Sequence, residues 1–284
     1  MKTALILEGG GMRGLYTAGV LDILMKNDIY TDVAVGVSAG ALFGINYKSK
    51  QIGRVLRYNI KYAGNPSYTG WKSLLKTGNL MNKEFWFEDI PFKLDPMDCE
   101  TYRNNKTEFH AVITNLINGK AEYKSIFDLE NKECMEYLRA SGSLPFCSKP
   151  VIVNGVPYLD GGIADSIPVN RAFECGCEKA IVILTQPRDY RKKHDKSLDL
   201  SAKLYKKYPD FAKALLSRPE NYNKTLENIE ELEKQGKVFV IAPKESLGIK
   251  RTERSPKEID RIFNQGIKDF ENLKDELLNF LGNN

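Results

Sequence analysis

The chain contains 284 residues, of which 42% are hydrophobic and 28% are charged, and its formal net charge is +5. This ordinary globular composition excludes a disordered or fibrous protein, and the length allows one large α/β domain or two small ones. The charge is too small to identify an anionic lipid surface or a nucleic acid as a partner, and no nucleic acid is expected.

The first forty residues have the pattern of two buried strands connected by a helix. The first apolar run is short and continuous, which is typical of a strand covered on both faces. Glycines interrupt it before apolar residues recur with helical spacing. Two strands joined by a helix form a crossover unit and predict a parallel sheet. The predicted elements are a strand at Ala4–Leu7, the glycine run Gly9–Gly14, a helix from Leu15 to about Lys26, a strand at Val33–Val37, the turn Ser38–Gly40 and a helix that begins near Ala41.

The middle of the chain is less regular. A helix is expected at Gln51–Tyr62, but residues 63–100 combine poor periodicity with many aromatic side chains, as lids and binding loops often do. These side chains suit either an apolar substrate channel or a plain core, and the core is favoured. They are Trp71, Leu74, Leu75, Phe85, Trp86, Phe87 and Phe92.

Hairpins, further strands and charged helices follow. Asn118-Gly119 and Asn154-Gly155 each separate two strand-like runs, which predicts antiparallel hairpins. The basic cluster from Arg188 to Lys196, which includes Lys192, is favoured as a solvated loop over a binding patch. The expected elements are hairpin strands at Phe109–Asn115 with Ala121–Ser125 and at Val151–Val153 with Val156–Leu159, a helix at Cys134–Ala140, strands at Lys179–Leu184 and Val238–Ile241, and amphipathic helices at Ser201–Ser217, Pro219–Gln235 and Pro256–Leu281.

The segment Gly36–Gly40 carries the first chemical signal. It fits the pattern G-x-S-x-G between a predicted strand and a predicted helix, a turn that strains the serine backbone and exposes its hydroxyl. Gly36 and Gly40 are needed because the strand and the helix approach too closely there for a Cβ atom. Ser38 is therefore the candidate nucleophile, and the alternative is a tight turn that merely uses small residues.

A serine hydroxyl is a poor nucleophile until a positioned base takes its proton. Asp160 is the preferred base because it ends an apolar strand and precedes Gly161 and Gly162, a sharp turn that would expose the carboxylate at the functional edge of the sheet. The alternative is an ordinary Asp-Gly turn. His110 lies within a predicted strand and His194 in a basic stretch, so a triad that also uses His194 stays open as a second hypothesis.

The glycine run is the third signal. Backbone N–H groups between a strand and a helix can converge on an anion, which in acyl transfer is the oxygen of the tetrahedral intermediate. The run also fits the dinucleotide-binding pattern, but that pattern requires an acidic residue at the end of the second strand, where this chain has the Ser38 turn. Arg13 can add positive charge or hold the shape of the loop. The run consists of Gly9, Gly10, Gly11, Met12, Arg13 and Gly14.

Other features argue against a metal, a disulfide framework and a membrane helix. The five cysteines are an odd number without regular spacing, and the Cys175-x-Cys177 pair has no histidine nearby, so ordinary thiols are expected. No apolar stretch approaches the ~20 residues of a membrane helix, and the first strand is too short for a signal peptide. The expectation is a cytoplasmic protein, and peripheral contact with a membrane surface stays open.

The three motifs together resemble those of the patatin-like phospholipase family. They are the glycine run, Gly36–Gly40 and Asp160–Gly162, and Ala140–Pro145 also resembles the family's small-residue segment before the aspartate. The resemblance covers about residues 1–185. It implies a three-layer α/β/α sandwich with a mostly parallel central sheet. Residues 1–185 would be the catalytic core, and 186–284 would be a helical C-terminal part, with one further strand, that packs on the same domain.

The resemblance also implies a lipid acyl hydrolase of the phospholipase A or esterase type. Ser38 would be the nucleophile and Asp160 the base of a dyad that requires no histidine, cofactor or metal. The glycine run would be the oxyanion hole, with the N–H groups of Gly10 and Gly11 as the preferred donors. Ser38 would form a covalent acyl-enzyme, and water activated by Asp160 would hydrolyse it. A non-catalytic or lipid-binding protein that keeps the fold is the third hypothesis.

Overall fold

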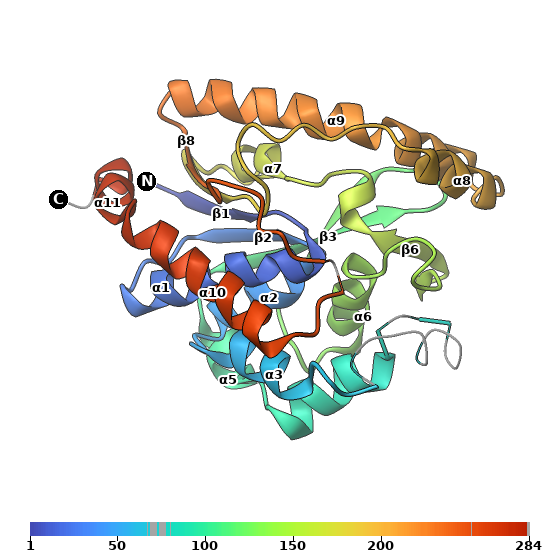
Figure 1. Ribbon diagram of the computed structural model, residues 1–284, viewed down its shortest axis with the longest axis horizontal. Helices are drawn as coiled ribbons and strands as arrows, with labels where there is room; N and C mark the ends of the chain where they lie inside the picture. Colours follow the sequence, from blue (N-terminus) through green and yellow to red (C-terminus); the bar gives the residue numbers. More distant parts are fainter. Residues whose placement is uncertain (67, 69–72, 74–77, 80, 251, 283–284) are drawn as a thin grey trace.

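One central sheet of eight strands organises the computed structural model, which describes residues 1–282 except 67, 69–72, 74–77, 80 and 251 (Figure 1). Its strand order is β5-β6-β3-β2-β1-β7-β8, and β4 also pairs with β3. The pairings from β3 to β8 along this order are parallel, whereas β4, β5 and β6 add antiparallel hairpins. The strands are β1 (Thr3–Leu7), β2 (Val33–Val37), β3 (Glu108–Asn115), β4 (Ala121–Ser125), β5 (Val151–Val153), β6 (Val156–Asp160), β7 (Lys179–Ile183) and β8 (Val238–Ile241).

Helices cover both faces of this sheet, as Figure 1 shows. Successive side chains of a strand point to opposite faces. In β1, Leu5 and Leu7 accordingly pack with α1 (Gly14–Lys26) and α10 (Pro256–Glu271), while Ala4 and Ile6 pack with α7 (Val169–Glu174) and α9 (Pro209–Lys234). Burial on both sides explains why the strand is continuously apolar in sequence. The predicted three-layer α/β/α fold with a mostly parallel sheet is confirmed.

The helical elements connect the strands. They are η1 (Gly11–Arg13), α1 (Gly14–Lys26), α2 (Ala39–Lys48), α3 (Arg54–Tyr62), the π-helical η2 (Phe85–Leu94), α5 (Cys99–Asn104), α6 (Lys132–Ser141), η3 (Gly161–Ile163), α7 (Val169–Glu174), α8 (Lys196–Leu204), α9 (Pro209–Lys234), α10 (Pro256–Glu271) and α11 (Lys274–Leu281).

The predicted strands and hairpins are confirmed, but the predicted breaks in the C-terminal helices are wrong. α9 begins at Pro209, because proline suits the first turn of a helix. The helix continues through Pro219, because α9 has buried residues on both sides of this proline that pack against the core. The helix expected over Pro256–Leu281 divides instead between α10 and α11.

The prediction that the aromatic side chains of residues 63–100 form a core is confirmed only in part. Phe85 and Phe87 are buried in the core, as favoured, whereas Phe92 is 40% exposed and Trp86 borders a cavity. Trp71, Leu74 and Leu75 lie outside the described residues. The segment also contains the helical elements η2 and α5, which the weak periodicity did not predict.

Candidate active site

The ends of three parallel strands define the edge of the sheet at which the candidate residues meet. β1, β2 and β7 run in the same direction, so their carboxyl ends lie side by side. Glu8, Ser38 and Thr185 follow these strands closely. Loops at this edge of an open α/β sheet are where such folds usually bind ligands.

Ser38 occupies a strained turn between β2 and α2. Its backbone has φ 55° and ψ −123°, a region that side chains rarely adopt. A Cβ atom on Gly36 would lie 2.6 Å from the Cα atom of Ala41, and one on Gly40 would lie 2.5 Å from the carbonyl oxygen of Leu7. Both glycines are therefore required by close backbone approach, as the sequence predicts.

The pairing register of β3 brings Asp160 to Ser38. β4 occupies one edge of β3 from His110 to Thr114, so β2 and β6 must share the other edge. β2 ends with Val37 opposite Val112, and β6 ends with Asp160 opposite the next residue, Ile113. The two strands meet end to end, which places the residue after Val37 beside Asp160.

The segment Ala140–Pro145 holds both candidate residues. The Ser38 N–H donates a hydrogen bond to the Ser141 hydroxyl at 2.9 Å, and the Asp160 N–H donates to the Ser143 carbonyl at 2.8 Å. The Asp160 carboxylate accepts a hydrogen bond from the Gly162 N–H at 2.8 Å and is 1% exposed. The segment Ala140–Pro145 thus holds both the candidate nucleophile and the candidate base in place.

The glycine run packs against the same turn. Gly11 has φ +58°, and a Cβ atom on Gly9 would lie 3.0 Å from the Cβ atom of Ser38. Glu8, a buried carboxylate that the sequence did not single out, anchors the start of the run. It accepts hydrogen bonds from the Thr185 N–H and, at 2.8 Å, from the Tyr222 hydroxyl. A charged residue directly after a buried strand is the signal that could have identified it.

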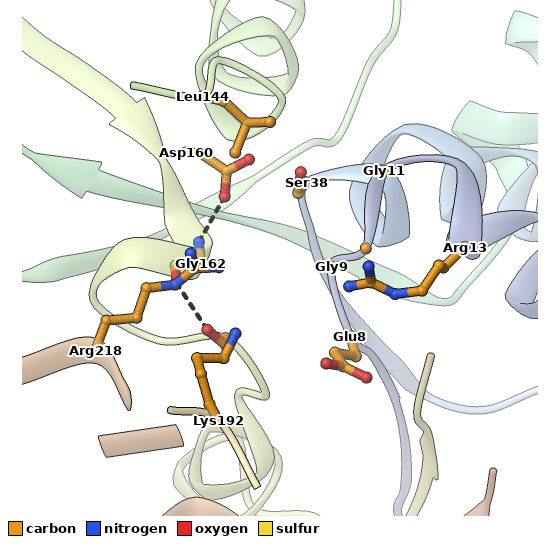
Figure 2. Close-up of a pocket in the computed structure, with 12 residues that line it drawn as sticks. Glu8, Gly9, Gly11, Arg13, Ser38, Leu144, Asp160, Gly162, Lys192 and Arg218 are labelled. Carbon is orange, nitrogen blue, oxygen red and sulfur yellow. Dashed lines mark hydrogen bonds between the residues drawn. The ribbon is translucent and has the colours of Figure 1, made fainter. Parts of the chain in front are cut away.

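Ser38 lines two neighbouring cavities. The first, here called the polar pocket, also contains Asp160 and, from the glycine run, Gly9, Gly10, Gly11 and Arg13 (Figure 2). The second, the apolar cavity, has a volume of about 230 Å³ and a predominantly hydrocarbon lining. The polar pocket is lined by Glu8, Gly9, Gly10, Gly11, Arg13, Ser38, Leu144, Asp160, Gly162, Ser166, Lys192 and Arg218. The apolar cavity is bordered, besides Ser38, by Met12, Leu42, Phe43, Met81, Trp86 and Leu144 among others.

The basic cluster divides between surface and pocket. Arg188 pairs with Glu233 and Arg191 pairs with Glu230 on the exposed side of α9. These surface ion pairs agree with the prediction that the cluster is a solvated loop. Lys192, however, lines the polar pocket, so the interpretation of the cluster as solvent-facing is wrong at this position. The direction of the Lys192 side chain depends on how the loop packs against α9, and no local sequence pattern reveals this packing.

Neither histidine lines the polar pocket or the apolar cavity in the described part of the chain. His194 is half-exposed and lies 3.1 Å from the Asp199 carboxylate. His110 is buried in β3, where burial and the nearby Arg171 guanidinium lower its pKa. The geometry therefore gives the triad hypothesis no support.

Comparison with known proteins agrees with this geometry. Residues 5–173 match the family model of the patatin-like phospholipases. The chain belongs to this family. A second model, described as a domain of unknown function, matches residues 208–282, which contain the whole of α9, α10 and α11. Membership of the patatin-like phospholipases places the chain in a family of lipid acyl hydrolases.

Individual relatives are distant. The chain is 30% identical over 193 residues to the uncharacterized protein YjjU of Escherichia coli, covering 66% of this chain and 52% of that protein. It is 29% identical over 188 residues to lysophospholipase NTE1 of Kluyveromyces lactis, covering 61% of this chain and 12% of that protein. The chain thus spans about half of the first relative and a small part of the second.

Among solved structures, VipD from Legionella pneumophila superimposes with a TM-score of 0.47 at 14% identity, over 97% of this chain and 67% of that one. In the residues that the structure describes, no helix is both long and apolar enough to cross a membrane.

Proposed function

We propose that the chain is a lipid acyl hydrolase that cleaves carboxylic esters through a Ser38–Asp160 dyad. The observation that carries this proposal is the position of Ser38, a strained residue at the junction between a polar pocket with a carboxylate and an apolar cavity. An acyl chain suits the cavity, because transfer of hydrocarbon out of water is favourable. The ester carbonyl then lies at the serine.

The first half of the reaction forms an acyl-enzyme. The Ser38 Oγ attacks the ester carbonyl as Asp160 takes the hydroxyl proton. The N–H groups of Gly10 and Gly11 face the negative oxygen of the tetrahedral intermediate, and one such donor stabilises the transition state by about 3 kcal/mol. The C–O bond to the alcohol breaks, and the alcohol leaves with the proton that Asp160 holds.

The second half reverses these roles. Asp160 takes a proton from water, whose oxygen attacks the acyl carbonyl of the serine ester. The same backbone donors stabilise the second oxyanion. Collapse of this intermediate returns the proton to Ser38 and releases the fatty acid. Neither step requires a histidine, a metal or a cofactor.

Hydrolysis of p-nitrophenyl octanoate by four purified proteins tests the proposal. Ser38→Ala and Asp160→Asn should each lower kcat by at least about a thousandfold, as removal of a catalytic nucleophile or its base does. His194→Ala should retain wild-type kcat because His194 lies outside the pocket. Circular dichroism confirms that each variant is folded.

The other hypotheses make different predictions for the same proteins. Loss of activity in His194→Ala with an intact fold would favour the triad. A wild-type protein that neither hydrolyses the ester nor reacts at Ser38 with a fluorophosphonate would contradict the dyad and favour a lipid-binding protein.

A further inference from the structure

A buried tyrosine of α9 contacts the start of the glycine run. The Tyr222 hydroxyl donates a hydrogen bond to the Glu8 carboxylate at 2.8 Å, although the two residues are 214 positions apart in the chain. Glu8 directly precedes Gly9 and lies within the patatin-like match, whereas Tyr222 lies in the segment that matches a domain of unknown function. One hydrogen bond therefore connects this second segment to the loop that we propose as the oxyanion hole.

Thr185, which follows β7, contacts both Glu8 and the glycine run. Its N–H and, at 3.1 Å, its hydroxyl donate to the same oxygen of the Glu8 carboxylate. The Thr185 hydroxyl also lies 3.3 Å from the Gly9 carbonyl oxygen, and a Cβ atom on Gly10 would lie 2.7 Å from it. Glu8 is thus held between α9 and the end of β7, and the glycine run begins directly against this contact.

The three residues of this network are almost completely buried. Tyr222 is 3% exposed, Glu8 is 2% exposed and Thr185 is 0% exposed. Burial and the Glu8 carboxylate raise the pKa of the Tyr222 hydroxyl, which therefore stays a donor at neutral pH. Hydrogen bonds to a charged acceptor are about twice as strong as those between neutral groups, so the Tyr222 contact holds Glu8 firmly.

The Tyr222 ring is itself fixed in position. It belongs to the buried face of α9 together with Leu226 and Ile229. The Tyr190 ring packs edge-on against it with the centroids 5.9 Å apart, and the Lys192 Nζ atom lies 4.2 Å from its centroid. The hydroxyl therefore presents a rigid contact to Glu8.

An oxyanion is stabilised best by donors that already point at it when the tetrahedral intermediate forms. The segment Gly9–Gly11 has no side chains through which its neighbours could hold it, and Gly11 has φ +58°. We propose that Tyr222, acting through Glu8, is a positioning residue that keeps the N–H groups of Gly10 and Gly11 aimed at the oxyanion. This inference rests on the proposed hydrolase function, and it gives the segment of unknown function a role in the reaction.

Tyr222→Phe tests the inference because it removes the hydroxyl and keeps the ring. With p-nitrophenyl octanoate, kcat should fall about tenfold, which is less than the loss of about 100- to 1000-fold on removal of an oxyanion donor, because the donors are displaced and not lost. KM should stay within about twofold, because neither Tyr222 nor Glu8 borders the apolar cavity in the described part of the chain. Tyr102→Phe is the matched control: it removes a comparably buried hydroxyl, which donates to the Ile126 carbonyl at 2.7 Å, and should keep the wild-type kcat.

A double-mutant cycle with Glu8→Gln separates an effect through Glu8 from a general loss of stability. Glu8→Gln keeps the shape of the side chain and replaces the charged acceptor by a neutral one, whose hydrogen bond is about half as strong. In this background, Tyr222→Phe should lower kcat only about threefold. An equal loss in both backgrounds, or a wild-type kcat in Tyr222→Phe, would overturn the inference and leave the hydrolase function standing.

Calorimetric titration with a trifluoromethyl ketone that carries an octyl chain measures the oxyanion hole without turnover. The Ser38 oxygen adds to the ketone carbon, the hydroxyl proton passes to Asp160, and the ketone oxygen becomes an oxyanion like that of the tetrahedral intermediate. The dissociation constant should rise about tenfold in Tyr222→Phe and keep its wild-type value in Tyr102→Phe. An unchanged dissociation constant in Tyr222→Phe would contradict the inference alone, whereas a wild-type protein that neither hydrolyses the ester nor binds the ketone would contradict the proposed function and the inference with it.

Discussion

At the scale of single residues, Ser141 connects the candidate nucleophile to the segment that also holds the candidate base. Its hydroxyl accepts the hydrogen bond from the Ser38 N–H, and Ser141 is completely buried. A buried N–H without a partner costs about 1–3 kcal/mol. The Ser141 hydroxyl therefore helps to stabilise the strained backbone of Ser38.

Ser141→Ala should lower kcat about tenfold with little change in KM, because the turn that aims the Ser38 hydroxyl loses its support while the acyl cavity is retained. Ser143→Ala is the control. It keeps the carbonyl that accepts from Asp160 and loses only a hydroxyl contact with the Arg139 carbonyl, so its kcat should stay within about twofold of wild type. Steady-state kinetics with a p-nitrophenyl ester measures both, and equal losses would assign the effect to the whole segment rather than to the Ser141 hydroxyl.

Some residues of the candidate site could be predicted from the sequence, and others could not. Ser38, Asp160 and the glycines carry local signals, since each lies at a strand end where the backbone itself requires small residues. Lys192 and Arg218 carry none, because the loop after β7 and the middle of α9 reach the pocket only through tertiary packing.

At the scale of elements, a buried carboxylate joins two helices. Asp22 of α1 is 3% exposed and accepts a hydrogen bond from the Gly53 N–H at the start of α3, at 2.6 Å. Burial raises the pKa of Asp22 from 3.8 to about 6, although the Gly53 N–H and the charges of Lys26 and Arg57 oppose the shift. The folded protein therefore binds a proton here that the unfolded chain has released.

This shift predicts that stability falls as the pH rises from about 4 to about 6, because the folded state holds more protons than the unfolded state in that window. Two pKa units correspond to about 3 kcal/mol. Asp22→Asn, which can keep the acceptor for Gly53, should gain stability relative to wild type by up to that amount between pH 4 and pH 7. Urea unfolding at both pH values measures the difference, and Asp28→Asn at an exposed turn serves as control. If the stability difference between wild type and Asp22→Asn did not change with pH, Asp22 would be ionised in the folded protein across this range.

The local sequence pattern predicts some secondary-structure elements well and others poorly. The buried strands are predicted well because two covered faces demand continuous apolar residues. The start of α9 was missed because the buried residues on both sides of Pro219 outweigh a proline's usual tendency to end a helix, whereas its end was predicted to within one residue.

At the scale of the whole molecule, residues 186–284 share the sheet and the core of residues 1–185. β8 pairs with β7, and α10 packs on α1 through two glycines. A Cβ atom on Gly19 would lie 2.0 Å from the Phe263 carbonyl oxygen, and one on Gly266 would lie 2.1 Å from that of Tyr16. We propose on this basis that residues 186–284 fold together with residues 1–185 as one cooperative unit.

Gly266→Ala should therefore destabilise the whole chain by about 3 kcal/mol, because the added methyl group forces α10 away from α1. Both tryptophans, Trp71 and Trp86, belong to the first 185 residues, so their fluorescence reports on that part of the chain, whereas circular dichroism also reports on the C-terminal helices. In urea, the two signals should shift together to a lower midpoint. Gly64→Ala, where an added Cβ meets nothing within 4 Å, should leave both midpoints near wild type. If Gly266→Ala shifted the dichroism and left the tryptophan transition in place, the C-terminal part would be a separate folding unit, and its cations would reach the polar pocket by docking rather than by a shared core.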